Sequence, residues 1–193
     1  MAAPRSASTW RSASGVTSFG RDSLIASLQN MVIYPEFAEA TLDALGRLQA
    51  TERDDYRDAE PGKILHELRF GELAHFKLVP HTPYYGTADA TALYLITLHE
   101  AWRWTGGLDL VRRLLPVAEG CLRWIDERGD QDGDGFQEYQ TRSTLGYENM
   151  GWKNAGDSVP NLAARWCAGR RRCVSSKAMS MTPGCAWRSC SMH

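Results

Sequence analysis

The sequence predicts an all-α fold built from pairs of helices that are joined by long loops. Apolar residues recur at helical spacing over residues 87–104 and 109–127, and a Thr-Gly-Gly sequence at 105–107 separates the two segments. The loops between the helical segments carry Tyr and Trp residues close to Gly and Pro. Helix pairs with such loops are typical of a helical toroid or solenoid, in which the loops at one end line a binding site.

Each expected helix has its own start or stop signal. Four helices are expected, over residues 22–31, 36–48, 87–104 and 109–127. Asp22 and Ser23 are suited to cap the first helix, and Pro35 separates it from the second. Pro116 is expected to bend the last helix. Three loops are expected, over residues 50–62, 71–86 and 130–139, and residues 64–70 could form an extended segment.

Composition limits the classes of function. With 43% hydrophobic residues among 193, the chain has enough apolar material for one core. A net charge of −1 gives no electrostatic reason to expect nucleic acid or an acidic membrane as a partner. The sequence has no run of about 18 apolar residues that would predict a transmembrane helix. The leader over residues 1–15 lacks the apolar region of a secretory signal, so we expect a cytoplasmic protein.

Charges and cysteines are unevenly distributed, and this divides the chain into three parts. Residues 161–193 contain six Lys or Arg residues, no acidic residue and four of the five cysteines. The spacings of 6, 12 and 5 residues between these cysteines match no CxxC pair of a zinc site. We expect a poorly ordered leader over residues 1–15, a globular region over residues 16–160 and an irregular tail over residues 161–193.

Two early segments carry residues that are suited to sugar binding. Arg21 and Asp22 combine a forked donor with an acceptor, as hydroxyl groups require, and the alternative is a helix cap with a salt bridge. Tyr84 and Tyr85 lie on a proline-stiffened loop and can stack on a pyranose, while Asp89 can accept hydroxyl hydrogen bonds. The alternative places both tyrosines in the core and Asp89 beside the helix dipole.

An acidic loop resembles part of a calcium site. Asp130, Asp132 and Asp134, followed by Gly135, imitate the first half of an EF-hand loop. Position twelve of that loop is Thr141 instead of the bidentate Glu. A loop closed by Asx turns is therefore the alternative that we favour, and we assign no metal site.

The Gly-flanked loop over residues 146–158 places Trp152 beside Lys153, Asn154 and Asp157. A Trp ring next to polar groups is what a sugar subsite requires, because the ring stacks on the sugar while the polar groups bind its hydroxyls. Composition alone does not identify an enzyme here.

Five segments occur in an order that resembles bacterial amylo-α-1,6-glucosidases, the glycogen-debranching type of glycoside hydrolase. They read FGRDSL, PGKILHELR, YYGTADAT, DGDGFQEY and NMGWKNAGDS, and the match covers about residues 15–159. The resemblance implies about half of an (α/α)6 toroid of the six-hairpin glycosidase class. It also implies hydrolysis of α-glucan or oligosaccharides with inversion, by two carboxylic acids and without a metal or other cofactor.

The resemblance gives each segment a role. The candidate sugar-binding residues are Arg21, Asp22, Tyr84, Tyr85, Asp89, Trp152 and Lys153. The general acid is expected in the last segment, where the family is expected to read close to GWKDSGDS. Asn154 stands at the position of that acid, and an amide has no proton of suitable acidity. Asp157 remains as the candidate acid, and the base would come from a later helical hairpin that this sequence does not contain.

The tail predicts a shift of the reading frame near residue 160. The family is expected to continue with EVQGYVYDA, whereas residues 176–183 read SKAMSMTP. The codons CAA GGC TAT GTC TAT GAC GCC encode QGYVYDA. When the nucleotides TC precede them and translation starts at that T, the same nucleotides encode the eight residues SKAMSMTP. We therefore expect a truncated glycosidase that is inactive alone, with apolar faces left open at the break. Two other classes stay open: a non-catalytic α-glucan-binding protein, and a helical scaffold, which would not explain the Gly-rich aromatic loops.

Overall fold

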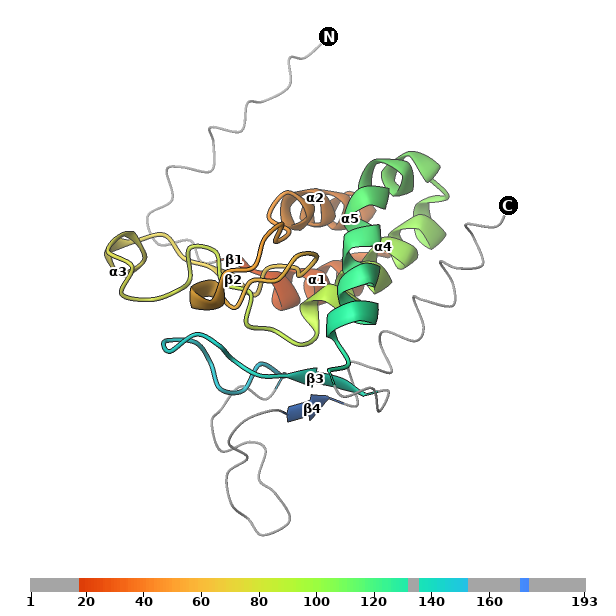
Figure 1. Ribbon diagram of the computed structural model, residues 1–193. Coiled ribbons are helices and arrows are strands. Elements are labelled where there is room, and N and C mark those ends of the chain that lie inside the picture. Colours follow the sequence, from red (N-terminus) through yellow and green to blue (C-terminus); the bar gives the residue numbers. More distant parts are fainter. Residues whose placement is uncertain (1–17, 132–135, 153–170, 174–193) are drawn as a thin grey trace.

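Four helices supply most of the regular structure in the computed structural model, which describes residues 18–131, 136–152 and 171–173. They are α1 (Gly20–Asn30), α2 (Pro35–Gly46), α4 (Ala90–Thr105) and α5 (Leu108–Arg128). Figure 1 shows these helices grouped together, with short strands to the left of the group and below it. The prediction of a mainly helical fold is thereby confirmed.

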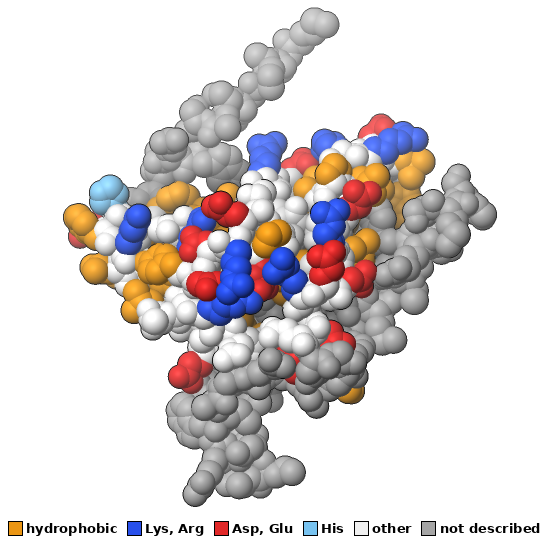
Figure 2. Space-filling view, viewed as in Figure 1, with side chains coloured by type: hydrophobic (Ala, Val, Ile, Leu, Met, Phe, Trp, Pro, Cys, Tyr) orange, Lys and Arg blue, Asp and Glu red, His pale blue; other side chains and the backbone are white. Residues whose placement is uncertain are grey.

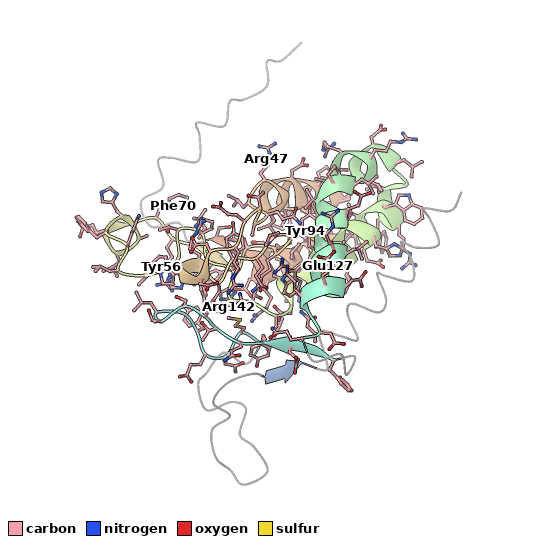
Figure 3. All side chains as sticks on the ribbon, viewed as in Figure 1. Arg47, Tyr56, Phe70, Tyr94, Glu127 and Arg142 are labelled. Carbon is pink, nitrogen blue, oxygen red and sulfur yellow. The ribbon has the colours of Figure 1, made fainter. Side chains whose placement is uncertain are left out.

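The core lies where α4 packs against α1, α2 and α5. Leu24, Leu42, Leu95 and Leu98 are fully buried there. Burying one such side chain stabilises the fold by roughly 1.5–3 kcal/mol. The hydroxyl of Tyr94 lies in the same interior and donates to the carbonyl of Leu42 over 3.0 Å, and Figure 3 shows this residue among the helices.

Local signals explain the start of α2 and the end of α4. Pro35 occupies the first position of α2, where its missing N–H costs nothing. Gly106, with a φ of 67°, ends α4, and its N–H donates to the carbonyl of Trp102 over 2.8 Å. Pro116 lies inside α5.

None of the helices in the described ranges combines the length and the apolar character that crossing a bilayer requires.

The start of α1 differs from the sequence prediction. The helix begins at Gly20, and Phe19 precedes it without a side-chain cap. Asp22 therefore lies in the first turn, where its charge faces the positive end of the helix dipole, and it is not the cap that the sequence predicted. A long-range contact fixes this start, because the N–H of Gly20 donates to the carbonyl of His66 over 2.8 Å. A Cβ at Gly20 would lie 1.8 Å from the carbonyl oxygen of Leu65, so only glycine fits.

Two short strands join the ends of distant segments. β1 (Ser18–Phe19) pairs antiparallel with β2 (Glu67–Leu68), with Phe19 opposite Glu67. Glu67 also forms an isolated bridge with Tyr84. The extended segment expected within residues 64–70 is present in part, as β2. The start of α1, β2 and the loop before α4 are thereby held together.

Three further elements lie where the sequence predicted loops. These are the 3₁₀ helix η2 (Asp55–Arg57), the short helix α3 (Glu72–His75) and the strand β3 (Gln137–Tyr139). β3 pairs antiparallel with β4 (Arg171–Cys173), and Figure 1 shows the pair below the end of α5. β4 lies within the expected irregular tail, of which the structure describes only these three residues. The expected leader and the rest of the tail lie outside the described residues.

Apolar side chains remain exposed around α3. Phe70, Leu73, Phe76 and Leu78 are each at least 56% exposed. Figure 2 shows apolar side chains gathered at the left edge of the molecule, where α3 lies in Figure 1, and Figure 3 places Phe70 on the same side. This segment contributes little to the core formed by the four long helices.

Candidate functional site

A cavity of about 420 Å³ lies beside the start of α1. Its volume falls within the range of about 300–1,000 Å³ that is usual for small-molecule sites. Eight residues from four segments of the chain line it: Phe19, Arg21, Asp22, His66, Glu67, Arg69, Tyr147 and Trp152. The cavity is thus a polar hollow with aromatic rings at its edge.

Arg21 is the best-anchored residue of the cavity. Its Nε donates to Oδ1 of Asp89 over 2.8 Å, and both side chains are more than nine-tenths buried. The hydroxyl of Thr87 bonds to the same carboxylate oxygen over 2.8 Å, and the guanidinium also reaches the carbonyl of Met150 at 3.4 Å. Removing one partner of such a pair leaves an uncompensated buried charge, so the pair fixes the guanidinium in place.

Trp152 and Asp22 are the exposed members of the predicted set. Trp152 is 61% exposed, and its ring centroid lies 5.7 Å from the guanidinium carbon of Arg21. Asp22, which is also exposed, lines the same cavity from the first turn of α1. The structure therefore brings together three residues that the sequence proposed for sugar binding, although Arg21 and Trp152 are 131 positions apart.

Glu67 forms the opposite wall of the cavity, and it is not among the candidate residues predicted from the sequence. Its side chain is 1% exposed and accepts a hydrogen bond from Nε of Arg69. The hydroxyl of Tyr147 donates to the other carboxylate oxygen over 3.3 Å. Burial, together with the negative charge of Glu67, raises the pKa of Tyr147, so this hydroxyl stays protonated and available as a donor. The signal was present in the segment PGKILHELR, which contains Glu67 and Arg69.

His66 is the second residue that was missed. It lines the cavity, is 8% exposed, and its Nδ1 has no hydrogen-bond partner among the described residues. Burial, aided by the positive charge of Arg21, lowers its pKa from 6.5 to about 4. The imidazole is therefore neutral at pH 7.

The two predicted tyrosines lie in the interior and do not line the cavity. Tyr84 is fully buried, and its hydroxyl donates to Oδ2 of Asp58 over 2.9 Å. Tyr85 is 5% exposed, and its hydroxyl donates to the carbonyl of Leu48 over 2.7 Å. This placement agrees with the alternative in which the tyrosines belong to the core. Both hydroxyls find an internal partner, which allows the rings to be buried.

Asp58 fastens the loop that carries Tyr147. Its buried carboxylate accepts the hydroxyl of Thr141 at 2.8 Å and the backbone N–H groups of Arg142 and Ser143 at 2.7 and 3.2 Å. Tyr84 extends this network, because its oxygen also accepts the N–H of Tyr147 over 2.9 Å. The wall formed by Tyr147 is thus attached to the helical body through Asp58 and Tyr84.

Several predicted residues lie outside the described residues, namely Lys153, Asn154, Asp157, Asp132 and Asp134. Asp130 is described and lies at the end of the segment that follows α5. No group of three or more His, Cys, Asp or Glu side chains with a metal-binding arrangement occurs within the described ranges.

Comparison of the chain with family models and with curated proteins gives no match. The fold and the cavity describe a mainly helical protein with a polar, aromatic-edged cavity at the start of its first helix.

Proposed function

We propose that this chain is part of a glycoside hydrolase that resembles bacterial amylo-α-1,6-glucosidases, and that the cavity beside α1 binds one sugar unit of an α-glucan. One observation carries this proposal: Arg21, Asp22 and Trp152 line a single cavity, with Asp89 directly behind Arg21. These residues come from three of the five segments that resemble the family. On this basis we also propose that the helices belong to an (α/α)6 toroid and that the protein is cytoplasmic.

The chemistry of the cavity suits a hexose. A pyranose presents apolar C–H faces and polar hydroxyl edges, and an exposed Trp ring can pack against the former. The carboxylate of Asp22 can accept hydroxyl hydrogen bonds. Arg21 offers donors whose positions are already fixed by Asp89, so little conformational entropy is lost when a ligand binds.

Hydrolysis with inversion requires one carboxylic acid to protonate the leaving oxygen and one carboxylate to activate water. We assign the acid to Asp157, because Asn154 carries an amide where the family carries the acid. A non-catalytic α-glucan-binding protein is the second candidate, and the same amide favours it.

Calorimetric titration of the full chain with panose, which contains both an α-1,6 and an α-1,4 linkage, tests the binding site. We expect Trp152→Ala to weaken binding at least about tenfold, or about 1.4 kcal/mol. Trp104→Ala is the matched control, since Trp104 is 57% exposed and does not line the cavity. Absence of panose binding by the wild type, or an equal loss in both variants, would overturn the proposal.

Glucose release separates the two candidates. A glycosidase should liberate glucose from panose, and Asp157→Ala should abolish this release while leaving panose binding intact. Because we expect this chain to be inactive alone, a version extended to a full toroid is assayed beside it. Release by the extended version alone would identify a truncated glycosidase, and binding without release by both would favour the non-catalytic protein.

A further inference from the structure

Asp22 brings to the cavity a negative charge that no described residue neutralises. The residue lies in the first turn of α1, lines the cavity and is exposed to solvent. Its carboxylate has no hydrogen bond and no ion pair within the described part of the chain. This carboxylate is therefore accessible to a ligand in the cavity and retains its full charge.

The other charges around the cavity are already compensated. Nε of Arg21 lies 2.8 Å from Oδ1 of Asp89, and both side chains are buried. Arg69 forms an ion pair with the buried carboxylate of Glu67. Burial lowers the pKa of His66 to about 4, so its ring is neutral at pH 7. Among the described residues that line the cavity, the carboxylate in the first turn of α1 thus carries the only uncompensated charge.

The helix dipole of α1 reduces this charge but does not cancel it. The start of a helix carries roughly half a unit of positive charge, so about half a unit of negative charge remains beside Asp22. The N–H of Gly20 is also unable to bind an anion, because it donates to the carbonyl of His66 over 2.8 Å. An anionic ligand is therefore repelled at this end of the cavity, whereas an ammonium group is attracted.

We infer, on the basis of the proposed function, that Asp22 sets the charge selectivity of the cavity, which binds uncharged and amino-bearing sugars and disfavours sugars that carry a phosphate group. A hydroxyl group can still donate to the carboxylate, so the uncharged sugar keeps its hydrogen bond. It follows that a phosphorylated unit of a glucan would have to lose its phosphate by hydrolysis before this cavity could bind it.

NMR titration of the full chain with glucosamine, glucose and glucose 6-phosphate at pH 7 tests this selectivity. The measured quantity is the ratio of the affinities for glucosamine and glucose 6-phosphate, at an ionic strength of about 10 mM, where charges act over about 30 Å. Asp22→Asn keeps the size of the side chain and should lower this ratio at least about fivefold, or about 1 kcal/mol. Comparing the ratio between variants cancels the differences in shape between the ligands and the contribution of every other charge.

Two variants and a change of salt isolate the charge of Asp22. Asp22→Glu keeps the charge and should keep the ratio within about twofold of the wild type. Asp109→Asn is the matched control, because it removes an equal charge from a side chain that is 94% exposed and does not line the cavity. About 1 M salt shortens the range of the charges to about 3 Å and should bring the ratio of the wild type close to that of Asp22→Asn.

The outcomes separate this inference from the proposed function. If the wild type binds glucose and the ratio is the same in Asp22→Asn, the inference is overturned and the proposed function stands. A loss of the ratio in Asp22→Glu as large as that in Asp22→Asn, or an equal loss in Asp109→Asn, would also overturn it. If the wild type binds none of the three sugars, the proposed function fails and the inference fails with it.

Discussion

Acidification should destabilise this protein through His66, in a pH window that the burial of the ring defines. The pKa of His66 is lowered from 6.5 to about 4 in the folded protein, mainly by desolvation. Between these two values the unfolded chain binds a proton at this residue and the folded chain does not, so the free energy of unfolding falls as the pH falls. The stabilisation is complete above pH 6.5 and is lost as the pH approaches 4. At about 1.36 kcal/mol for each pKa unit, the full loss is about 3 kcal/mol.

Urea unfolding at pH 7, 6, 5 and 4 measures this loss when the wild type is compared with His66→Phe. The variant has no imidazole to protonate, so its free energy of unfolding should fall less steeply with pH. Protonation of carboxylates also destabilises the protein in acid. Glu60 is an example: burial acts to raise the pKa of its carboxyl, but the positive charge of Lys63 and hydrogen bonds from Trp124 and Arg142 outweigh burial and lower this pKa. Their contribution cancels when the two proteins are subtracted. His99→Phe serves as the control and should keep the slope of the wild type.

The role of His66 is refuted if the difference in free energy of unfolding between the wild type and His66→Phe stays constant, within about 0.5 kcal/mol, from pH 7 to pH 4. Such a result would mean that the imidazole takes up its proton as easily in the folded chain as in the unfolded one.

Three further predictions concern stability and use urea unfolding as the measurement. Asp58→Ala leaves the N–H groups of the loop without their acceptor and should cost about 3–5 kcal/mol, whereas a cost below about 1 kcal/mol would contradict the role of this carboxylate. Arg21→Met and Asp89→Asn should show a coupling above about 1.5 kcal/mol in a double-mutant cycle, and additive effects would argue against a buried ion pair. Gly62→Ala should destabilise the protein more than Gly106→Ala. Both glycines have a positive φ, but only at Gly62 would an added Cβ lie 2.2 Å from a backbone oxygen of α5. Equal losses of unfolding free energy in the two variants would contradict this steric explanation.

The sequence predicted the helices because their signals are local. Apolar periodicity and the Gly106 stop signal indicated α4, and the structure differs mainly at its start, which lies at Ala90 instead of residue 87. The β1–β2 pair could not be predicted in this way, because a strand of two residues has no pattern of its own. The start of α1 depends on a contact between Gly20 and His66, which are 46 positions apart.

The cavity residues also differ in whether their role depends on local sequence or on tertiary contacts. Arg21, Asp22 and Trp152 were found because charged and aromatic residues in loops and at helix starts are suited to ligands whatever the fold. Glu67 was missed because its importance comes from burial beside Arg69 and Tyr147, which only the tertiary structure creates. Tyr84 and Tyr85 lie in the interior for the converse reason, since their hydroxyls meet partners that the sequence does not place beside them.

Backbone pairing connects the walls of the cavity, and this affects how its side chains should be interpreted. Phe19 pairs with Glu67, and Glu67 in turn bridges to Tyr84, so backbone pairing joins the start of α1 to the opposite wall. Because these contacts use backbone atoms, substituting a side chain that lines the cavity need not open the walls. It follows that a lost affinity in Trp152→Ala reports the missing ring, whereas a lost affinity in Asp58→Ala reports a displaced Tyr147 loop. The two variants therefore separate the chemistry of recognition from the scaffold that positions it.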